Sequence, residues 1–138
     1  MNKKLIMIFV SAFITGIILV VVASILIKTP EEHANEFVEQ LKAGEVKDDS
    51  VKDKADDLKQ FIEFPTVKKL DQTRMIIDSA ENLDNAYEVR VRFQAYEYKD
   101  EKDSEDVIES YDGSLYIKMK KIGFRDWDII DVRIDPYQ

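Results

Sequence analysis

The chain has 138 residues, 28 of them acidic and 20 basic, which gives a formal net charge of −8 at pH 7, and it contains no cysteine. Because every acidic residue but only 17 basic ones lie after Pro30, residues 31–138 carry a net charge of −11, and such a surface repels nucleic acid as a partner. Without cysteines no disulfide holds the fold, so its apolar core must do so.

The N-terminal segment, residues 5–27, is a run of 23 residues without a charge. A bilayer core of roughly 30 Å requires about 20 helical residues, so this run predicts a transmembrane helix in contact with membrane lipid. Lys3 and Lys4 precede it, and basic residues at the end of a first helix favour the cytoplasmic side. We therefore expect a cytoplasmic stub at residues 1–4, a transmembrane helix at 5–27 and an extracytoplasmic domain at 28–138 of a single-pass cell-membrane protein.

Secretion after cleavage of a signal peptide is the alternative to an anchor. Val21-Val22-Ala23 resembles a cleavage site, but the apolar run continues past it through Ile27, which favours the uncleaved helix. No cysteine follows the run, which excludes a lipid-modified lipoprotein. Ala12 and Gly16 form one small-xxx-small pair of the kind that lets two helices approach closely. A single pair is common in apolar sequence, so the oligomeric state stays open.

A helix is predicted to begin almost where the apolar run ends. In Thr29-Pro30-Glu31-Glu32, Thr29 can cap the helix, Pro30 suits its first position and Glu32 can complete a capping box. The next apolar residues fall on one helical face, and Gly44 then ends the helix. These apolar residues are Ala34, Phe37, Val38 and Leu41.

The charged segment from Glu45 to Lys59 predicts a second amphipathic helix. Its apolar residues follow one another at spacings of four, three and four, and they are Val51, Ala55, Leu58 and Ile62. Ser50 is a candidate cap for this helix. Phe64-Pro65-Thr66 should break the helical pattern, and residues 67–70 would form one further turn.

From Thr73 onward the sequence predicts strands. A short apolar run at 74–78 is followed by turn residues at 81–85 and then by an alternating strand whose buried face carries Tyr87, Val89, Val91, Phe93 and Ala95. Tyr96 and Tyr98 have the opposite parity, so either a bulge lies near Ala95 or aromatic rings cover the outer face there. A charged loop is expected at 99–106, and a strand follows at 107–120 with Leu115, Ile117 and Met119 on one face. The chain then continues with a turn at 121–125 and a last strand at 127–134.

These elements predict an α+β fold, in which an N-terminal transmembrane helix is followed by two to three helices packed on a curved antiparallel sheet of about four strands. Three features of the sequence resemble the nuclear transport factor 2-like (cystatin-like α+β cone) superfamily, in its small membrane-anchored bacterial extracytoplasmic version. They are the long meander, the terminal residues 127–132, and the helix pattern of Ala34, Phe37, Val38, Leu41 and Gly44. The resemblance covers residues 30–135 and implies a cone that can enclose a pocket. Subunits of conjugation and secretion machines also carry this domain behind one N-terminal helix, although their cytoplasmic tails are typically longer than four residues.

No residue pattern in the sequence requires catalysis, a cofactor or a metal. A glycine-rich phosphate loop, a Ser-His-Asp constellation and a nucleophilic cysteine are all missing from the sequence. His33 is the only histidine, and because a metal site needs several convergent ligands we expect an exposed polar residue there.

Two groups of acidic residues are candidate sites. Asp126 and Asp128 share a strand face and resemble an acid and base pair, but their register is ambiguous and solvent-facing acids are the simpler interpretation. The loop acids at 100, 103, 105 and 106 could gather calcium, yet their loop lacks the glycine of an EF-hand.

Seven residues are candidates for a surface that meets a partner or lines a pocket: Tyr96, Tyr98, Tyr111, Tyr116, Trp127, Arg90 and Arg92. Aromatic residues and arginine are enriched at protein interfaces, although aromatic residues also fill ordinary sheet cores. With a short linker and no catalytic pattern, we expect a membrane-anchored, non-catalytic domain that mediates protein–protein interaction in the cell envelope. The alternatives are a small-molecule-binding or enzymatic cone-fold domain, or a subunit of a conjugation or secretion apparatus.

Overall fold

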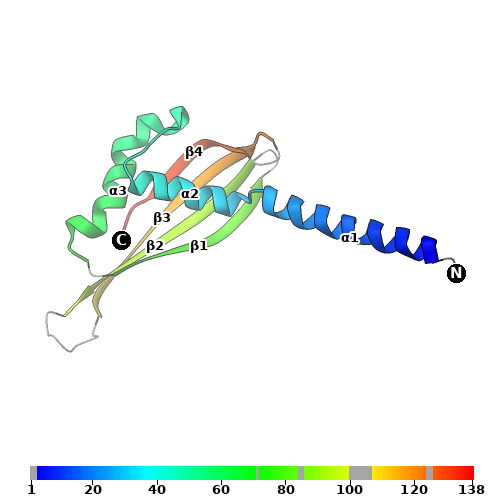
Figure 1. Ribbon diagram of the computed structural model, residues 1–138. Coiled ribbons are helices and arrows are strands. Elements are labelled where there is room, and N and C mark those ends of the chain that lie inside the picture. The colour runs from blue at the N-terminus through cyan, green and yellow to red at the C-terminus, as the bar shows by residue number, and fades with distance from the viewer. Residues whose placement is uncertain (1–2, 71, 84–85, 100–106, 124–125) are drawn as a thin grey trace.

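The computed structural model describes residues 3–70, 72–83, 86–99, 107–123 and 126–138. Their elements are α1 (Lys3–Leu26), α2 (Pro30–Lys42), the 3₁₀ helix η1 (Asp49–Lys54), α3 (Ala55–Val67), β1 (Gln72–Leu83), β2 (Ala86–Tyr98), β3 (Val107–Lys121) and β4 (Trp127–Asp135). Figure 1 shows α1 projecting away from the other elements, with α2 and α3 on one face of the sheet. The α+β prediction is confirmed.

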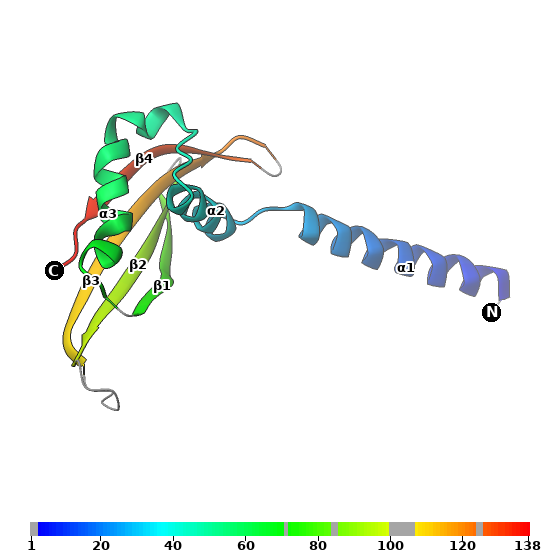
Figure 2. The same cartoon turned by 60° about the vertical axis from the view of Figure 1, so that its left-hand side comes forward.

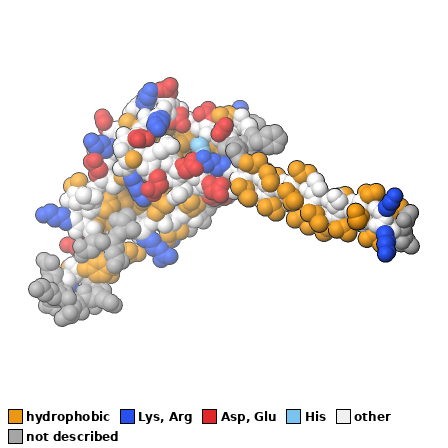
Figure 3. Space-filling model, in the orientation of Figure 1, with side chains coloured by type: hydrophobic (Ala, Val, Ile, Leu, Met, Phe, Trp, Pro, Cys, Tyr) orange, Lys and Arg blue, Asp and Glu red, His pale blue; other side chains and the backbone are white. Residues whose placement is uncertain are grey.

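The apolar run forms one continuous helix, as predicted. α1 has 24 residues and therefore a length of about 36 Å, and none of its side chains is buried. It is the one helix in the described part of the chain that is long and apolar enough to cross a membrane. Figure 3 shows apolar side chains along α1, in contrast to the mixed charges over the helices of the domain.

The start of α2 also matches its prediction. The backbone N–H of Glu32 donates to Thr29 Oγ1 at 3.2 Å, and the backbone N–H of Thr29 donates to Glu32 Oε2 at 3.0 Å, which completes a capping box. The predicted apolar face is buried and joins the core of the domain. Gly44 has a φ of 75°, a conformation that glycine adopts without steric cost.

The prediction of one helix capped by Ser50 is wrong, because the segment divides into η1 and α3. Ser50 lies inside η1, where its hydroxyl donates to the backbone carbonyl of Ile129 instead of capping a helix. Val51 and Leu58 are both fully buried, so the predicted stripe does reach the core, with a change of helix type between them. The contact between Ser50 and β4 is tertiary and has no signature in local spacing.

Pro65 does not break α3 where the sequence suggested. α3 continues through it to Val67, and Pro65 itself is buried. The proline lies in the last turn of the helix, where only one backbone hydrogen bond is lost. The helix then closes with Lys69 at a φ of 55° and with a hydrogen bond of 2.9 Å from the N–H of Leu70 to the carbonyl of Pro65, which is a Schellman arrangement.

The four strands form an antiparallel meander in the order β1-β2-β3-β4. β1 is longer than predicted: it runs to Leu83 and includes residues 81–83, which were expected in a turn. A register shift between Ile77 and Ser79 lies just before this extension, and a simple alternation rule does not anticipate it. Figure 2 shows the twist of the sheet, whose concave side faces α2 and α3.

The structure shows which face of the sheet each side chain of β2 and β4 occupies. Tyr96 continues the alternation of β2, so aromatic rings cover the outer face there, and the irregularity falls later, between Glu97 and Tyr98. In β4, the register shifts between Ile129 and Asp131. Because of that shift, Trp127 and Ile129 are buried before it and Val132 after it, whereas Asp126 and Asp128 are exposed as the simpler interpretation had it.

Candidate functional site

The outer face of the sheet is the face opposite α2 and α3, and no described helix packs against it (Figures 1 and 2). Strand register places four of the five arginines of the chain on this face, and they are Arg74, Arg90, Arg92 and Arg133. The fifth, Arg125, is outside the described residues. In a domain with a net charge of −11, these residues concentrate guanidinium groups on one surface.

Two of these arginines flank the ring of Tyr116. The guanidinium carbon of Arg133 lies 3.8 Å from the ring centroid, and that of Arg90 lies 5.6 Å from it. Cation–π contact favours this arrangement and holds the planar guanidinium groups in a fixed orientation. Arg90 Nε also donates to Ser114 Oγ at 3.3 Å, and Glu88 Oε1 lies 4.0 Å from Arg133 Nη2.

Arg92 lies next to this stack on the same strand. Its Nε is buried, and it has no hydrogen-bond partner in the described part of the chain. Ser114, which lies opposite Arg92 in the register, is 3% exposed although it is on the outer face. A carboxylate is the group that a guanidinium binds best, through two parallel hydrogen bonds. The outer face can therefore offer arginine donors to an acidic ligand.

Tyr96 and Tyr98 extend the outer face toward the far end of β2. Their ring centroids are 6.5 Å apart, and the Tyr96 hydroxyl donates to Gln94 Oε1 at 3.3 Å. Both rings are half-buried, so part of each remains accessible. Five of the seven candidate residues thus lie together: Arg90, Arg92, Tyr96, Tyr98 and Tyr116.

Tyr111 does not belong to this surface. It lies opposite the buried residue Ala95, on the face that the helices cover, and its ring meets that of Phe64 at 5.6 Å between centroids. Its hydroxyl donates to Glu109 Oε2 at 2.8 Å, and this hydrogen bond raises the pKa of Tyr111. Its role is in the packing of α3.

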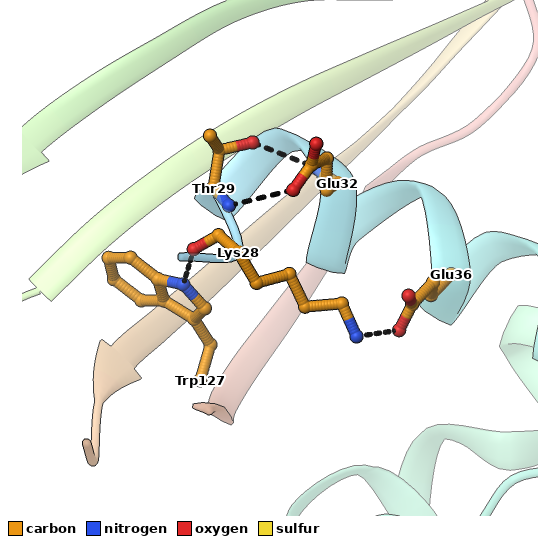
Figure 4. A network of polar contacts seen from close by, with 5 residues as sticks. All are labelled: Lys28, Thr29, Glu32, Glu36 and Trp127. Carbon is orange, nitrogen blue, oxygen red and sulfur yellow. Dashed lines mark hydrogen bonds and ion pairs between the residues drawn. The ribbon is translucent and has the colours of Figure 1, made fainter. Parts of the chain in front are cut away.

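Trp127 is also away from the outer face, since its side chain is 7% exposed and packs edge-to-face against Tyr87 at 5.2 Å between ring centroids. Its indole N–H donates to the backbone carbonyl of Lys28 at 2.9 Å (Figure 4). Lys28 joins α1 to α2, and its ammonium group pairs with Glu36. We call the contact between Trp127 and Lys28 the junction clamp, because it attaches the end of α1 to β4.

His33 is half-buried beside the junction clamp, which corrects the expectation of an exposed residue. It lines a hollow of about 200 Å³ that also includes Trp127, Glu36 and Asp48. Its Nδ1 is buried without a hydrogen-bond partner in the described residues. Burial, and then the charge of Lys28, lower the pKa of His33.

A metal site is not supported by the described residues, in which no three His, Cys, Asp or Glu side chains come together. The four acids of the 99–106 loop that are candidates for calcium binding lie outside the described residues.

The face that α2 and α3 cover is closed by aromatic side chains. Phe61 packs on Phe93 and Tyr137 at centroid distances of 5.3 and 5.0 Å, and a Cβ atom on Gly113 would lie 2.9 Å from the Phe61 ring. A surface hollow of about 430 Å³ remains between α3 and the C-terminal residues, and Phe64 and Tyr137 stack in its wall at 4.4 Å. Burial raises the pKa of Tyr137.

The sequence alone predicts neither the junction clamp nor the stack of Arg90, Tyr116 and Arg133, which we call the arginine stack. Trp127 and Lys28 are 99 residues apart, and only the fold brings them together. The sequence predicts part of the arginine stack, because Arg90 and Arg92 lie on one predicted strand. It does not predict Arg133, which reaches the stack only through the pairing of β3 with β4.

Comparison with known proteins does not assign a family. No protein-family model matches the chain, and neither a curated protein nor a solved structure does. The resemblance to the nuclear transport factor 2-like superfamily therefore rests on its packing pattern and stays a prediction.

Proposed function

We propose that this chain is a membrane-anchored, non-catalytic protein whose extracytoplasmic domain binds another protein of the cell envelope or membrane. α1 is the anchor, with its N-terminal lysines on the cytoplasmic side and residues 28–138 outside. The length of α1 and the charges before it support this orientation. The outer face of the sheet is the binding surface.

The observation that carries the proposal is the stack of Arg90, Tyr116 and Arg133 on a sheet face without a covering helix. Ordered arginine and tyrosine side chains dominate the binding energy at many protein interfaces. The guanidinium groups favour a carboxylate-rich segment on the partner. The same register places Glu88, Asp112 and Asp135 on this face, so the attraction for such a segment is local to the guanidinium groups.

The junction clamp supports a partner in the same membrane. Two residues, Lys28 and Thr29, separate the apolar run 5–27 from α2, and the hydrogen bond to Trp127 restricts even this short linker. The domain is thereby held near the bilayer surface and has a short reach. A protein anchored in the same membrane can meet it at that height.

Photo-crosslinking in intact cells tests this function. We would place a photoreactive amino acid at Tyr98 on the outer face and, in a separate chain, at Lys59 on the exposed side of α3. The proposal predicts a discrete adduct with one envelope or membrane protein from position 98 and a much weaker one from position 59. Equal adducts from both positions, or adducts from position 59 alone, would contradict binding at the outer face.

A second candidate function, small-molecule binding, has the hollow beside α3 in its favour. Phe61, Phe64 and Tyr137 give this hollow an apolar wall, and Asp57 and Gln60 give it a polar edge. The resemblance to cone-fold proteins adds support, since that fold can enclose ligands. Substitution of Phe64 by Ala should then weaken a ligand-induced rise in melting temperature found in a metabolite screen, and a screen without any such rise would count against this candidate.

Two further alternatives concern the role of α1. A conjugation or secretion subunit is a special case of the proposed function, and it predicts that deletion of the chain abolishes transfer. A cleaved signal peptide would release the domain, and the intact mass of the protein isolated from cells separates this outcome from the anchor. The full chain has a mass of 16.1 kDa, so loss of the N-terminal helix gives a clearly lighter species.

A further inference from the structure

The end of β3 nearest to α1 presents an exposed apolar residue directly after two lysines. Ile122 follows β3 directly and is 63% exposed, and Lys120 and Lys121 before it are exposed as well. Figures 1 and 2 both show the end of β3 and the start of β4 at the end of the sheet that adjoins the junction of α1 with α2. The Val107 end of β3 lies at the opposite end of the domain.

The junction clamp fixes this site relative to α1. Trp127 donates to the carbonyl of Lys28, two residues after the last residue of α1. Lys121 lies directly opposite Trp127 in the register of β3 and β4, so their Cα atoms are about 5 Å apart. Ile122 is one residue further, and its backbone N–H donates to the carbonyl of Asp126 at 2.9 Å. Ile122 therefore lies close to the level at which α1 ends.

The residues around Ile122 suit the boundary between water and lipid. An isoleucine at this level can enter the acyl boundary, and the long lysine side chains can reach phosphate groups while their stems contact lipid. Lys121 already places its ammonium group 5.9 Å from the ring of Trp127. Asp126 and Asp128 are exposed nearby and oppose the attraction to anionic lipid, so the apolar contact of Ile122 must contribute as well.

We propose that Lys120, Lys121 and Ile122 form a second membrane contact, which docks the domain onto the anionic bilayer leaflet from which α1 emerges. This inference rests on the proposed anchoring by α1. It adds that the domain is tied to the membrane at two points. Two attachment points fix the tilt of the sheet and hence the direction in which the outer face points.

Site-directed spin labelling of the full chain in lipid nanodiscs tests the contact. Because the chain has no cysteine, Ile122→Cys provides a single labelling site, and Ile108→Cys at the other end of β3 is a matched control with 60% exposure. In discs that contain phosphatidylglycerol, the label at 122 should show high accessibility to oxygen and low accessibility to a water-soluble nickel chelate. The label at 108 should show the reverse. Equal nickel accessibility at the two positions would overturn the proposal.

A label at Ile17→Cys in α1 separates this inference from the proposed function. If the α1 label lies in the bilayer while the label at 122 behaves like the label at 108, the anchor stands and the second contact is wrong. If the α1 label is exposed to water, both the anchor and the contact are wrong. A change at 122 that requires more than one copy of the chain in a disc would indicate contact with a second copy and would also overturn the lipid contact.

Charge reversal tests whether Lys120 and Lys121 contribute to the membrane contact. The double variant K120E/K121E should raise nickel accessibility at position 122 at least twofold in anionic discs, whereas K52E/K59E, with the same change of charge on η1 and α3, should leave it unchanged. Phosphatidylcholine discs without anionic lipid should weaken the contact of the unaltered chain. An equal effect of both double variants would contradict a local role for Lys120 and Lys121.

Discussion

The junction clamp makes a prediction that can be worked out from one hydrogen bond. In the variant Trp127→Phe, an aromatic ring remains against Tyr87, but the indole N–H that donates to the carbonyl of Lys28 at 2.9 Å is lost. A neutral hydrogen bond contributes about 0.5 to 1.5 kcal/mol, and a buried carbonyl left without a donor costs about 1 to 3 kcal/mol. Because Lys28 is only half-buried, water can replace part of the lost bond. We therefore expect the variant to lose about 1 to 2 kcal/mol of the free energy of unfolding.

The measurement is thermal unfolding of the full chain in detergent micelles, followed by circular dichroism at a wavelength that reports the sheet. A loss of about 1 kcal/mol corresponds to a decrease of roughly 4 to 8 °C in the melting temperature of a domain of this size. Trp127→Ala should cost more, about 3 to 5 kcal/mol, since it removes the buried ring as well. If Trp127→Phe melted at the same temperature as the unaltered chain, the junction clamp would not contribute to stability, and the short reach would rest on the two-residue linker alone.

Three further predictions concern the covered face of the sheet and α2. Gly113→Ala should lower the free energy of unfolding by about 1 to 3 kcal/mol, because the new Cβ would lie 2.9 Å from the ring of Phe61, whereas Gly123→Ala meets nothing within 4 Å and should have the smaller effect in the same urea titration. Thr29→Ala should cost about 1 kcal/mol through loss of the capping box, and an unchanged urea midpoint would show that the cap is dispensable. The pKa of His33 is lowered from 6.5 by burial, so its neutral form is favoured in the folded state and its contribution to stability is lost as the pH falls from 6.5 toward the lowered pKa. The decrease in the urea midpoint between pH 7.5 and pH 5.5 should therefore be smaller in His33→Gln, and an equal decrease would refute this role.

The spacing of apolar residues predicted those helices and strands that bury one face against the core. The stripe of α2 and the alternation of β2 each place apolar residues against one core, so period alone was sufficient. Prediction failed where a tertiary contact replaced a local rule. Ser50 donates to the carbonyl of Ile129 on β4 instead of capping a helix. Pro65 is a different case with a local cause, since it lies in the last turn of α3, where proline removes only one backbone hydrogen bond.

The candidate site was predictable only in part, for a related reason. Parity along β2 identified Arg90 and Arg92 as neighbours on one face, because side chains alternate along a strand, but it left two alternatives for Tyr96 that only the structure decides. The position of Arg133 beside Tyr116 depends on the register of β4, which a shift between Ile129 and Asp131 alters. Such a shift moves every later side chain to the opposite face, so spacing in the sequence could not assign Arg133 to the stack.

The central claim is that the outer face binds a protein partner through its arginine stack, and the yield of the crosslinked adduct from position 98 in intact cells tests it most directly. The variant Arg133→Glu removes the guanidinium that lies 3.8 Å from the ring of Tyr116, while Lys59→Glu makes the same change of charge on α3. A residue that dominates an interface contributes about 2 kcal/mol or more, so Arg133→Glu should reduce the adduct at least tenfold and Lys59→Glu should leave it unchanged. Equal yields from the two variants, at equal amounts of folded protein in the membrane, would contradict the account.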